Sequence, residues 1–129
     1  MHEFHQIINQ IKFDKNGLVT AIIQDALSGQ VLMVAYMNRD SLLKTLKEKK
    51  TYFFSRKRKK IWLKGETSGH FQIVKEIFVD CDLDALLIKV EQKVAACHTG
   101  FYSCFYRKIE EGELKEVGQK VFNPEEVYK

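Results

Sequence analysis

Three cysteines and three aspartates lie within 25 residues of this 129-residue chain, which has no other cysteine. The aspartates occupy alternate positions, and the second and third cysteines are seven positions apart. Thiolates are soft ligands that suit zinc, whereas carboxylates suit hard cations such as magnesium or calcium. The segment therefore predicts two kinds of metal site side by side. Its candidate ligands are Asp80, Cys81, Asp82, Asp84, Cys97 and Cys104.

The directions of the aspartate side chains depend on the backbone of residues 80–84. If this stretch is extended, the three carboxylates project to one side and Cys81 to the other, because side chains alternate along a strand. The same five residues also fit a turn between two strands, where aspartate often caps the backbone. The extended alternative would let one segment serve two different metal ions.

Cys97 and Cys104 cannot share a zinc ion on a regular helix. Seven residues of helix separate them by about 10 Å along the axis. Two sulfurs bound to one zinc ion lie within about 4 Å of each other. The spacing therefore predicts a loop that doubles back, and Gly100 supplies the backbone freedom for one.

Three thiolates leave one position of a tetrahedral zinc site for another ligand. An open position that holds water would make the site catalytic, and the residues favour this interpretation. The alternative is a structural Cys₃His site, closed by His98 or His70. His98 directly follows Cys97, and this adjacency makes it awkward for both residues to bind one ion.

A basic stretch precedes the candidate ligands, although the formal charge of the whole chain is only +4. Ten lysines or arginines, four aromatic residues and one acidic residue lie between residues 44 and 64. This mixture is typical of a surface that binds single-stranded nucleic acid, and it also suits the phosphates and base of a small nucleotide. A solvated helix face followed by a basic turn is the remaining alternative.

Composition and length predict one soluble globular domain over residues 1–129, with 45% hydrophobic and 29% charged residues. The sequence contains no apolar run of membrane-spanning length and no pattern of a signal peptide at its start. Three cysteines are an odd number for a disulfide framework, so we expect a reducing, cytoplasmic environment.

The patterning predicts an α+β fold in which strands predominate and the few helices are short. Asn38 or Asp40 is expected to cap a helix that contains Leu42, Leu43 and Leu46. The expected strands pair into hairpins around residues 26–30, the basic turn 56–60 and residues 110–113. They cover residues 18–24, 31–37, 52–55, 61–64, 71–79, 86–90, 105–109 and 114–117.

Several separate motifs resemble phosphoribosyl-AMP cyclohydrolase, in the order that this family has them. The resemblance runs from about Phe13 to Arg107. Its motifs are Gly17-Leu18-Val19, Gln24-Asp25, Val31-Leu32-Met33, Tyr36-Met37-Asn38, Tyr52 with Ser55-Arg56, residues 62–69 (WLKGETSG), residues 80–84 (DCDLD), Ala96-Cys97-His98-Thr99-Gly100 and Ser103-Cys104-Phe105.

The resemblance implies an intertwined homodimer that hydrolyses a small nucleotide in histidine biosynthesis, without a nucleic-acid or membrane partner. One zinc ion per subunit is held across the interface, by Cys81 of one copy and by Cys97 and Cys104 of the other. The family's magnesium ligands correspond to Asp80, Asp82 and Asp84. A single cyclohydrolase domain is expected, without the fused pyrophosphohydrolase domain of some relatives.

The implied substrate, phosphoribosyl-AMP, is an AMP whose ring nitrogen N1 carries a second ribose phosphate. Zinc-activated water would attack C6 and break the N1–C6 bond, opening the ring to a formimino aminoimidazole carboxamide ribotide. The enzyme would thus be a hydrolase of a C–N bond in a cyclic amidine. Zinc deaminases attack adenine C6 in the same way, although their sequence signature is absent here.

His98 is the candidate proton shuttle, because it adjoins a zinc ligand and because imidazole side chains in general can exchange protons near physiological pH. A histidine hydrogen-bonded in a loop is the alternative. Phosphate can be bound by arginine forks, by hydroxyls and by the backbone amides of a glycine-containing turn. Trp62 either stacks on a base or belongs to the core. The candidate substrate contacts are Ser55, Arg56, Arg58, Trp62, Lys64, Gly65, Thr67 and Ser68.

Overall fold

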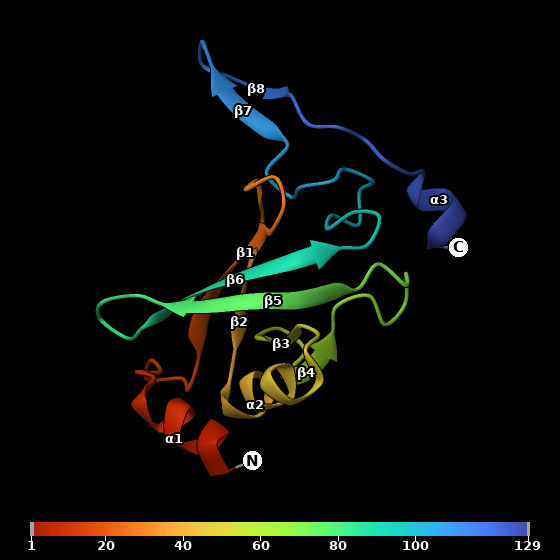
Figure 1. Ribbon diagram of the computed structural model, residues 1–129. Helices are drawn as coiled ribbons and strands as arrows, with labels where there is room; N and C mark the ends of the chain where they lie inside the picture. The colour runs from red at the N-terminus through yellow and green to blue at the C-terminus, as the bar shows by residue number, and fades with distance from the viewer. Residues whose placement is uncertain (1, 129) are drawn as a thin grey trace.

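The computed structural model describes residues 2–128. The centre of the fold is a four-stranded mixed β-sheet (Figure 1). The spatial order of the strands is β2-β1-β6-β5, with β1 and β6 parallel and the other two pairs antiparallel. These strands are β1 (Val19–Asp25), β2 (Val31–Met37), β5 (Gln72–Val79) and β6 (Ala85–Gln92). The strand-rich α+β fold is confirmed, and the parallel pair is a feature that the sequence did not reveal.

The hairpin predicted around residues 26–30 is present between β1 and β2. The Asp25 amide donates to the Gln30 carbonyl at 2.8 Å, and the Asp25 carboxylate accepts from the Leu27 amide at 2.9 Å. Gly29 has a φ of +80°, the left-handed conformation that glycine adopts without strain. The aspartate and the glycine therefore close this turn.

Helix α2 (Arg39–Glu48) is capped by Asn38 rather than by Asp40. The Asn38 side chain accepts from the Ser41 amide, and the Ser41 hydroxyl accepts from the Asn38 amide, each at 2.8 Å. This reciprocal capping box satisfies two amides that the helix itself leaves unpaired. It fixes where the chain leaves β2 and enters the helix.

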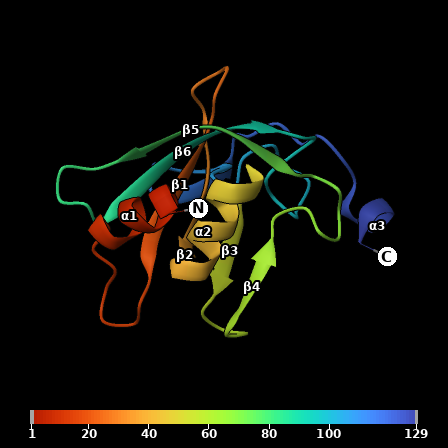
Figure 2. The same ribbon diagram turned by 60° about the horizontal axis from the view of Figure 1, so that its bottom comes forward.

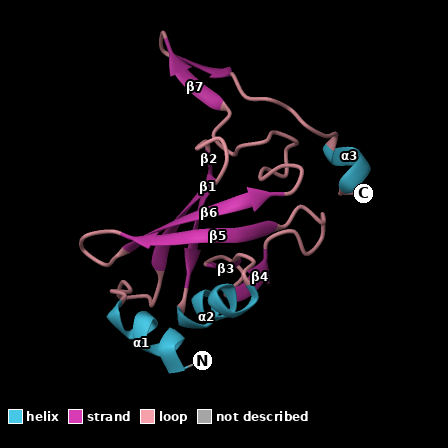
Figure 3. Cartoon of the chain, in the orientation of Figure 1, coloured by secondary structure: helices cyan, strands magenta, loops and turns pink. Residues whose placement is uncertain are grey.

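The basic turn joins β3 (Tyr52–Ser55) to β4 (Lys60–Leu63), as the sequence predicts. The Lys59 amide donates to the Ser55 carbonyl at 2.7 Å, and the Arg58 amide donates to the Ser55 hydroxyl at 3.1 Å. The predicted hairpin around residues 110–113 is also present, between β7 (Arg107–Glu110) and β8 (Glu113–Glu116). It projects away from the main sheet (Figures 1 and 3).

Two helices were not placed by the sequence patterns, namely α1 (His2–Gln10) and α3 (Pro124–Val127). Figure 2 shows α1, α2 and the β3–β4 hairpin on one side of the main sheet. The core lies between them and the sheet, and burial of these apolar side chains stabilises the fold. It includes Ile8, Val19, Ala21, Ile23, Leu32, Met37, Leu42, Phe53, Leu86, Ile88 and Val90.

The opposite face of the main sheet carries a row of apolar side chains across all four strands. The strand registers pair Val34 with Ile22, Ile22 with Leu87, and Leu87 with Phe78. The two outer members, Val34 and Phe78, are 45% and 46% exposed. This outer apolar row is therefore only partly covered within one chain.

Among residues 2–128, none of the helices has both the length and the apolar character that a membrane-spanning helix needs.

Candidate functional site

The segment 80–84 is a turn between β5 and β6, so of the two alternatives left open by the sequence the turn is confirmed and the extended segment is not. The Leu83 amide donates to the Asp80 carbonyl at 3.0 Å, and Leu83 has a φ of +65°. The Asp80 carboxylate also accepts from the amides of Asp84 and Ala85, at 3.0 and 3.2 Å. Aspartate's ability to cap backbone amides favours the turn over the strand here.

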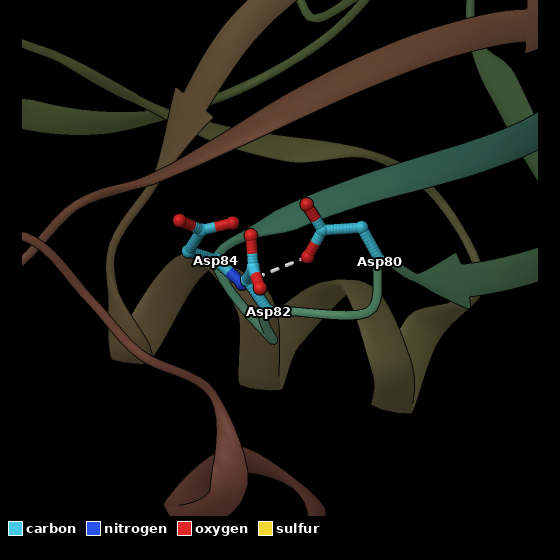
Figure 4. A group of neighbouring side chains, drawn as sticks. All are labelled: Asp80, Asp82 and Asp84. Atoms are coloured by element: carbon cyan, nitrogen blue, oxygen red, sulfur yellow. Dashed lines mark hydrogen bonds between the residues drawn. The ribbon is translucent and has the colours of Figure 1, made fainter.

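The turn nevertheless brings the three carboxylates together. Each of Asp80, Asp82 and Asp84 offers one oxygen, and these oxygens lie within 4.8 Å of one another (Figure 4). The Asp84 amide holds the pKa of Asp80 below its usual value, whereas a hydrogen bond and repulsion from Asp80 raise the pKa of Asp84. The separation is close to the span of about 4–5 Å across a six-coordinate magnesium or calcium ion, so the exposed donor set fits a hard cation.

The segment from Cys97 to Cys104 is a loop that doubles back, as predicted. The Gly100 amide donates to the Cys97 carbonyl at 3.1 Å, and the Cys97 amide donates to the Phe101 carbonyl at 3.2 Å. Gly100 has a φ of +103°, and a Cβ atom there would lie 2.4 Å from the carbonyl oxygen of Phe122. Only glycine fits at this position, because the C-terminal segment crosses directly over it.

The loop brings the thiols of Cys97 and Cys104 close enough together for Cys97 to raise the pKa of Cys104. Cys104 is an exposed residue, but partial desolvation of its thiol and the nearby Cys97 raise its pKa to about 12, and Lys64 opposes the rise. The Cys97 thiol also contacts the Thr99 hydroxyl at 2.9 Å. A soft divalent cation would supply the positive charge that two adjacent thiolates require, so the pair fits part of a zinc site.

Cys81 lies far from this pair within one chain. It occupies the turn before β6, whereas the loop with Cys97 follows the other end of the strand (Figure 1). Eight residues of strand separate the two ends by about 25 Å. Within residues 2–128, the three aspartates are the only group of three or more candidate metal ligands. Neither three thiolates nor the alternative Cys₃His set is therefore assembled inside a single described chain.

The two histidines near the cysteine loop have different surroundings. His98 is exposed and lines a hollow beside Lys64. His70 is buried, and its ring meets the edge of Phe122 with the centroids 4.8 Å apart. Burial and the nearby Lys64 lower the pKa of His70. His98 is thus the more accessible of the two for exchanging protons with a bound ligand.

The predicted substrate contacts surround two hollows. The first, which we call the Arg56 pocket, has a volume of about 580 Å³ and is lined by Ser55, Arg56 and Trp62. The second, the Lys64 pocket, has a volume of about 230 Å³. It is lined by the remaining predicted contacts together with His98 and, again, Trp62. These remaining contacts are Arg58, Lys64, Gly65, Thr67 and Ser68.

Trp62 belongs both to the edge of the core and to the walls of these pockets. It packs against the fully buried Phe53, with ring centroids 5.1 Å apart, and remains partly exposed. The two interpretations of this residue, as a core residue and as a ligand contact, are therefore geometrically compatible. Tyr36 also lines the Arg56 pocket, as a contact that the sequence patterns did not single out.

Lys64 links the Lys64 pocket to the cysteine loop. Its ammonium group donates to the carbonyl of Ala96, directly before Cys97. Burial lowers the pKa of Lys64, whereas the two neighbouring thiols oppose this shift. The adjoining Gly65 has a φ of +92°, and a Cβ atom there would lie 2.7 Å from the Phe71 amide. The turn after β4 is therefore tightly constrained beside the candidate metal ligands.

The side-chain amides of Gln72 and Gln92 form a hydrogen-bond network that connects the sheet to the segment before the cysteine loop. The Gln72 side chain accepts from the Thr51 hydroxyl and donates to the Gln92 side chain, both at 2.7 Å. The Gln92 amide nitrogen in turn donates to the carbonyls of His70, Lys93 and Ala95, at 3.1 to 3.2 Å. These bonds connect the backbone before β5 to the backbone that leads from β6 into the cysteine loop.

Replacing Gln92 by glutamate is expected to destabilise the fold by about 3 kcal/mol, because a carboxylate cannot donate to the three carbonyls. Denaturant unfolding measures this loss of stability. The matched control is Gln10→Glu, at an exposed glutamine that donates to one helix carbonyl. Its expected effect is within about 0.5 kcal/mol. Equal midpoints for the two variants would contradict the role assigned to the network.

The chain is similar in sequence to known proteins. The family model described as phosphoribosyl-AMP cyclohydrolase matches residues 33–106. This range includes the cysteine loop, the acidic turn of residues 80–84 and every residue that lines the two pockets except Tyr128. The phosphoribosyl-AMP cyclohydrolases of Chlorobium chlorochromatii and Pelotomaculum thermopropionicum are each 56% identical to the chain. These matches cover 95% and 94% of this chain, and 90% and 95% of the relatives.

A bifunctional histidine-biosynthesis protein, HisIE of Thermoanaerobacter pseudethanolicus, is 57% identical over 95% of the chain, which spans 56% of that relative's length. The chain therefore belongs to the phosphoribosyl-AMP cyclohydrolase family of histidine-biosynthesis enzymes.

Proposed function

We propose that two copies of this chain together open the adenine ring of phosphoribosyl-AMP by hydrolysis of the N1–C6 bond. Family membership supports the substrate and the reaction. The observation that carries the mechanism is that the cysteine loop places Cys97 and Cys104 near each other and near Lys64, which lines a pocket together with His98. In this proposal, a zinc site built from these thiolates would adjoin a pocket that binds the nucleotide.

The third sulfur ligand in this proposal comes from a second copy. Cys81 is exposed at the opposite end of β6, so a partner chain can present it to the cysteine pair. The outer apolar row supports such an assembly, because exposed apolar patches commonly mark interfaces. In a twofold dimer, Cys81 of each copy would complete the site of the other, and two equivalent zinc sites would form.

Zinc bound at this site would lower the pKa of water, so that hydroxide is available near neutral pH for addition to C6. His98 would accept a proton at the rim of the Lys64 pocket and return it to N1 as the C6–N1 bond breaks. Lys64, together with the hydroxyls of Thr67 and Ser68, would bind the substrate and orient the ring. Trp62 would offer an aromatic surface to the purine.

In this proposal the acidic turn holds magnesium. Because Cys81 lies within the same turn, the copy that supplies Cys81 would also place its magnesium ion close to the shared zinc site. An Asp82→Asn variant is expected to need about tenfold more magnesium for half-maximal activity, because one of three carboxylates loses its charge. Zinc content should stay unchanged. Magnesium titration with parallel metal analysis checks both points. An unchanged magnesium requirement would contradict the assignment of Asp82.

The function is tested by an ultraviolet assay of ring opening with purified protein and phosphoribosyl-AMP. Activity should disappear when a strong chelator removes the metals, should stay absent when magnesium alone is added back, and should return when zinc is added together with magnesium. The protein should remain folded during the cycle, which circular dichroism monitors, because the core is formed by apolar packing rather than by metal. Ring opening that continues in the metal-free protein would refute the zinc mechanism.

A further inference from the structure

We infer that Trp62 divides the substrate site, so that the Arg56 pocket binds the phosphoribosyl arm on N9 and the Lys64 pocket binds the arm on N1. This inference rests on the proposed function, because it assigns the two ends of phosphoribosyl-AMP. That substrate carries one phosphate at each end of a single purine. A site for it therefore needs two separate anion-binding regions, joined by a surface for the base.

The Arg56 pocket has a cation that is already oriented for an anion. The guanidinium carbon of Arg56 lies 4.2 Å from the centroid of the Tyr36 ring. The ion pairs formed within residues 2–128 do not include Arg56, so no carboxylate neutralises its charge. Stacking on Tyr36 limits the motion of the side chain and leaves the N–H groups at its edge for phosphate. Tyr36 thus acts as a positioning residue.

The Lys64 pocket has the chemistry of the reacting end. It contains His98, and the Lys64 ammonium group donates to the carbonyl that precedes Cys97. Thr67 and Ser68 add hydroxyls, and Glu66 adds a carboxylate that can accept from ribose hydroxyls. The bond that breaks joins C6 to N1. The arm on N1 must therefore lie on the side of the metal ligands, in this pocket.

Trp62 is the wall that the two pockets share. Its contact with the buried Phe53 holds the indole in place, and the Lys64 nitrogen lies 5.9 Å from its ring centroid. A purine lying over this indole would direct N1 and C6 toward Lys64 and N9 toward Arg56. The orientation of the substrate thus follows from which pocket adjoins the thiols.

The test uses AMP, which has the N9 arm and lacks the arm on N1, as a binding probe that needs no turnover. Titration calorimetry gives its dissociation constant for the zinc-loaded wild-type protein and for each variant. Arg56→Gln is expected to weaken AMP binding by about tenfold to a hundredfold, because a charged hydrogen-bond donor to phosphate is lost. Lys15→Gln controls for the loss of one positive charge, because Lys15 is exposed and lines neither pocket. This variant should leave AMP binding unchanged.

The complementary variant is Thr67→Val, which removes a hydroxyl from the Lys64 pocket with little change of shape. It is expected to raise the KM for phosphoribosyl-AMP by about three- to tenfold while leaving AMP binding within about twofold of wild type. Equal weakening of AMP binding by Arg56→Gln and Thr67→Val would overturn the division into two arms. AMP binding that is unaffected by Arg56→Gln would overturn it as well.

Failure of the proposed function gives a different result from failure of this inference. If the wild-type protein does not open phosphoribosyl-AMP, the proposed reaction is wrong, and the AMP titrations still decide which pocket holds the N9 arm. If turnover is normal and AMP binding depends on Thr67 rather than on Arg56, the reaction stands and the orientation is reversed.

Discussion

A Cys104→Ser chain is expected to lose its zinc and to lose at least about 10³-fold in ring-opening rate, which corresponds to about 4 kcal/mol of transition-state stabilisation. Serine is a poor replacement because its hydroxyl is a much weaker zinc ligand than a thiolate. Metal analysis of the purified protein and the ultraviolet assay measure the two losses. Neither activity nor metal should return when zinc is added.

The fold should survive this change. The Cys104 amide donates to the Leu32 carbonyl at 2.7 Å, and this backbone bond does not depend on the side chain. The thermal midpoint of the metal-free variant should therefore match that of the metal-free wild-type protein. Wild-type activity in a zinc-free Cys104→Ser preparation would remove the thiolate from the mechanism.

Gly100→Ala is expected to destabilise the protein by about 3 kcal/mol or more, from two additive causes. The left-handed backbone costs alanine about 1–2 kcal/mol, and the new methyl group would clash with the Phe122 carbonyl. Relief of this clash must move either the cysteine loop or the segment that crosses it. We therefore expect a lower unfolding midpoint and weaker zinc retention.

Gly29→Ala is the matched control for this prediction. Gly29 also has a positive φ, of +80°, but no atom lies within 4 Å of the position where its Cβ would be. This variant should show the backbone cost alone, about 1–2 kcal/mol, with normal zinc content. If both variants lose the same stability and both keep their zinc, the crossing segment does not constrain the loop.

The local elements of this fold could be predicted because their signals lie close together in the sequence. The hairpin after β1 follows from an aspartate and a glycine in its turn, and α2 follows from Asn38 before an apolar repeat. The parallel pairing of β1 with β6 could not be predicted, because it joins strands that lie about 60 residues apart. The helix α1 was not placed from the sequence, and among its side chains whose burial is described only Ile8 is fully buried.

The candidate site was predictable in its residue types and only partly in its geometry. The glycine within the cysteine loop indicated the reversal that brings Cys97 and Cys104 together. For residues 80–84 the sequence left a turn and an extended segment as alternatives. The turn is stabilised by three backbone amides that donate to Asp80, and these hydrogen bonds become visible only in the structure. The stacking of Arg56 on Tyr36 joins a turn to an edge strand, so no local pattern reveals it.

The most direct test of a zinc site shared between two copies mixes two inactive variants, Cys81→Ser and Cys97→Ser, under conditions that allow subunits to exchange. In a mixed dimer, one site has both defects and the other has all three cysteines. Equal random mixing makes half of the dimers mixed, so about a quarter of wild-type activity should appear. Demonstrated exchange without any recovery of activity would contradict a site built from both chains.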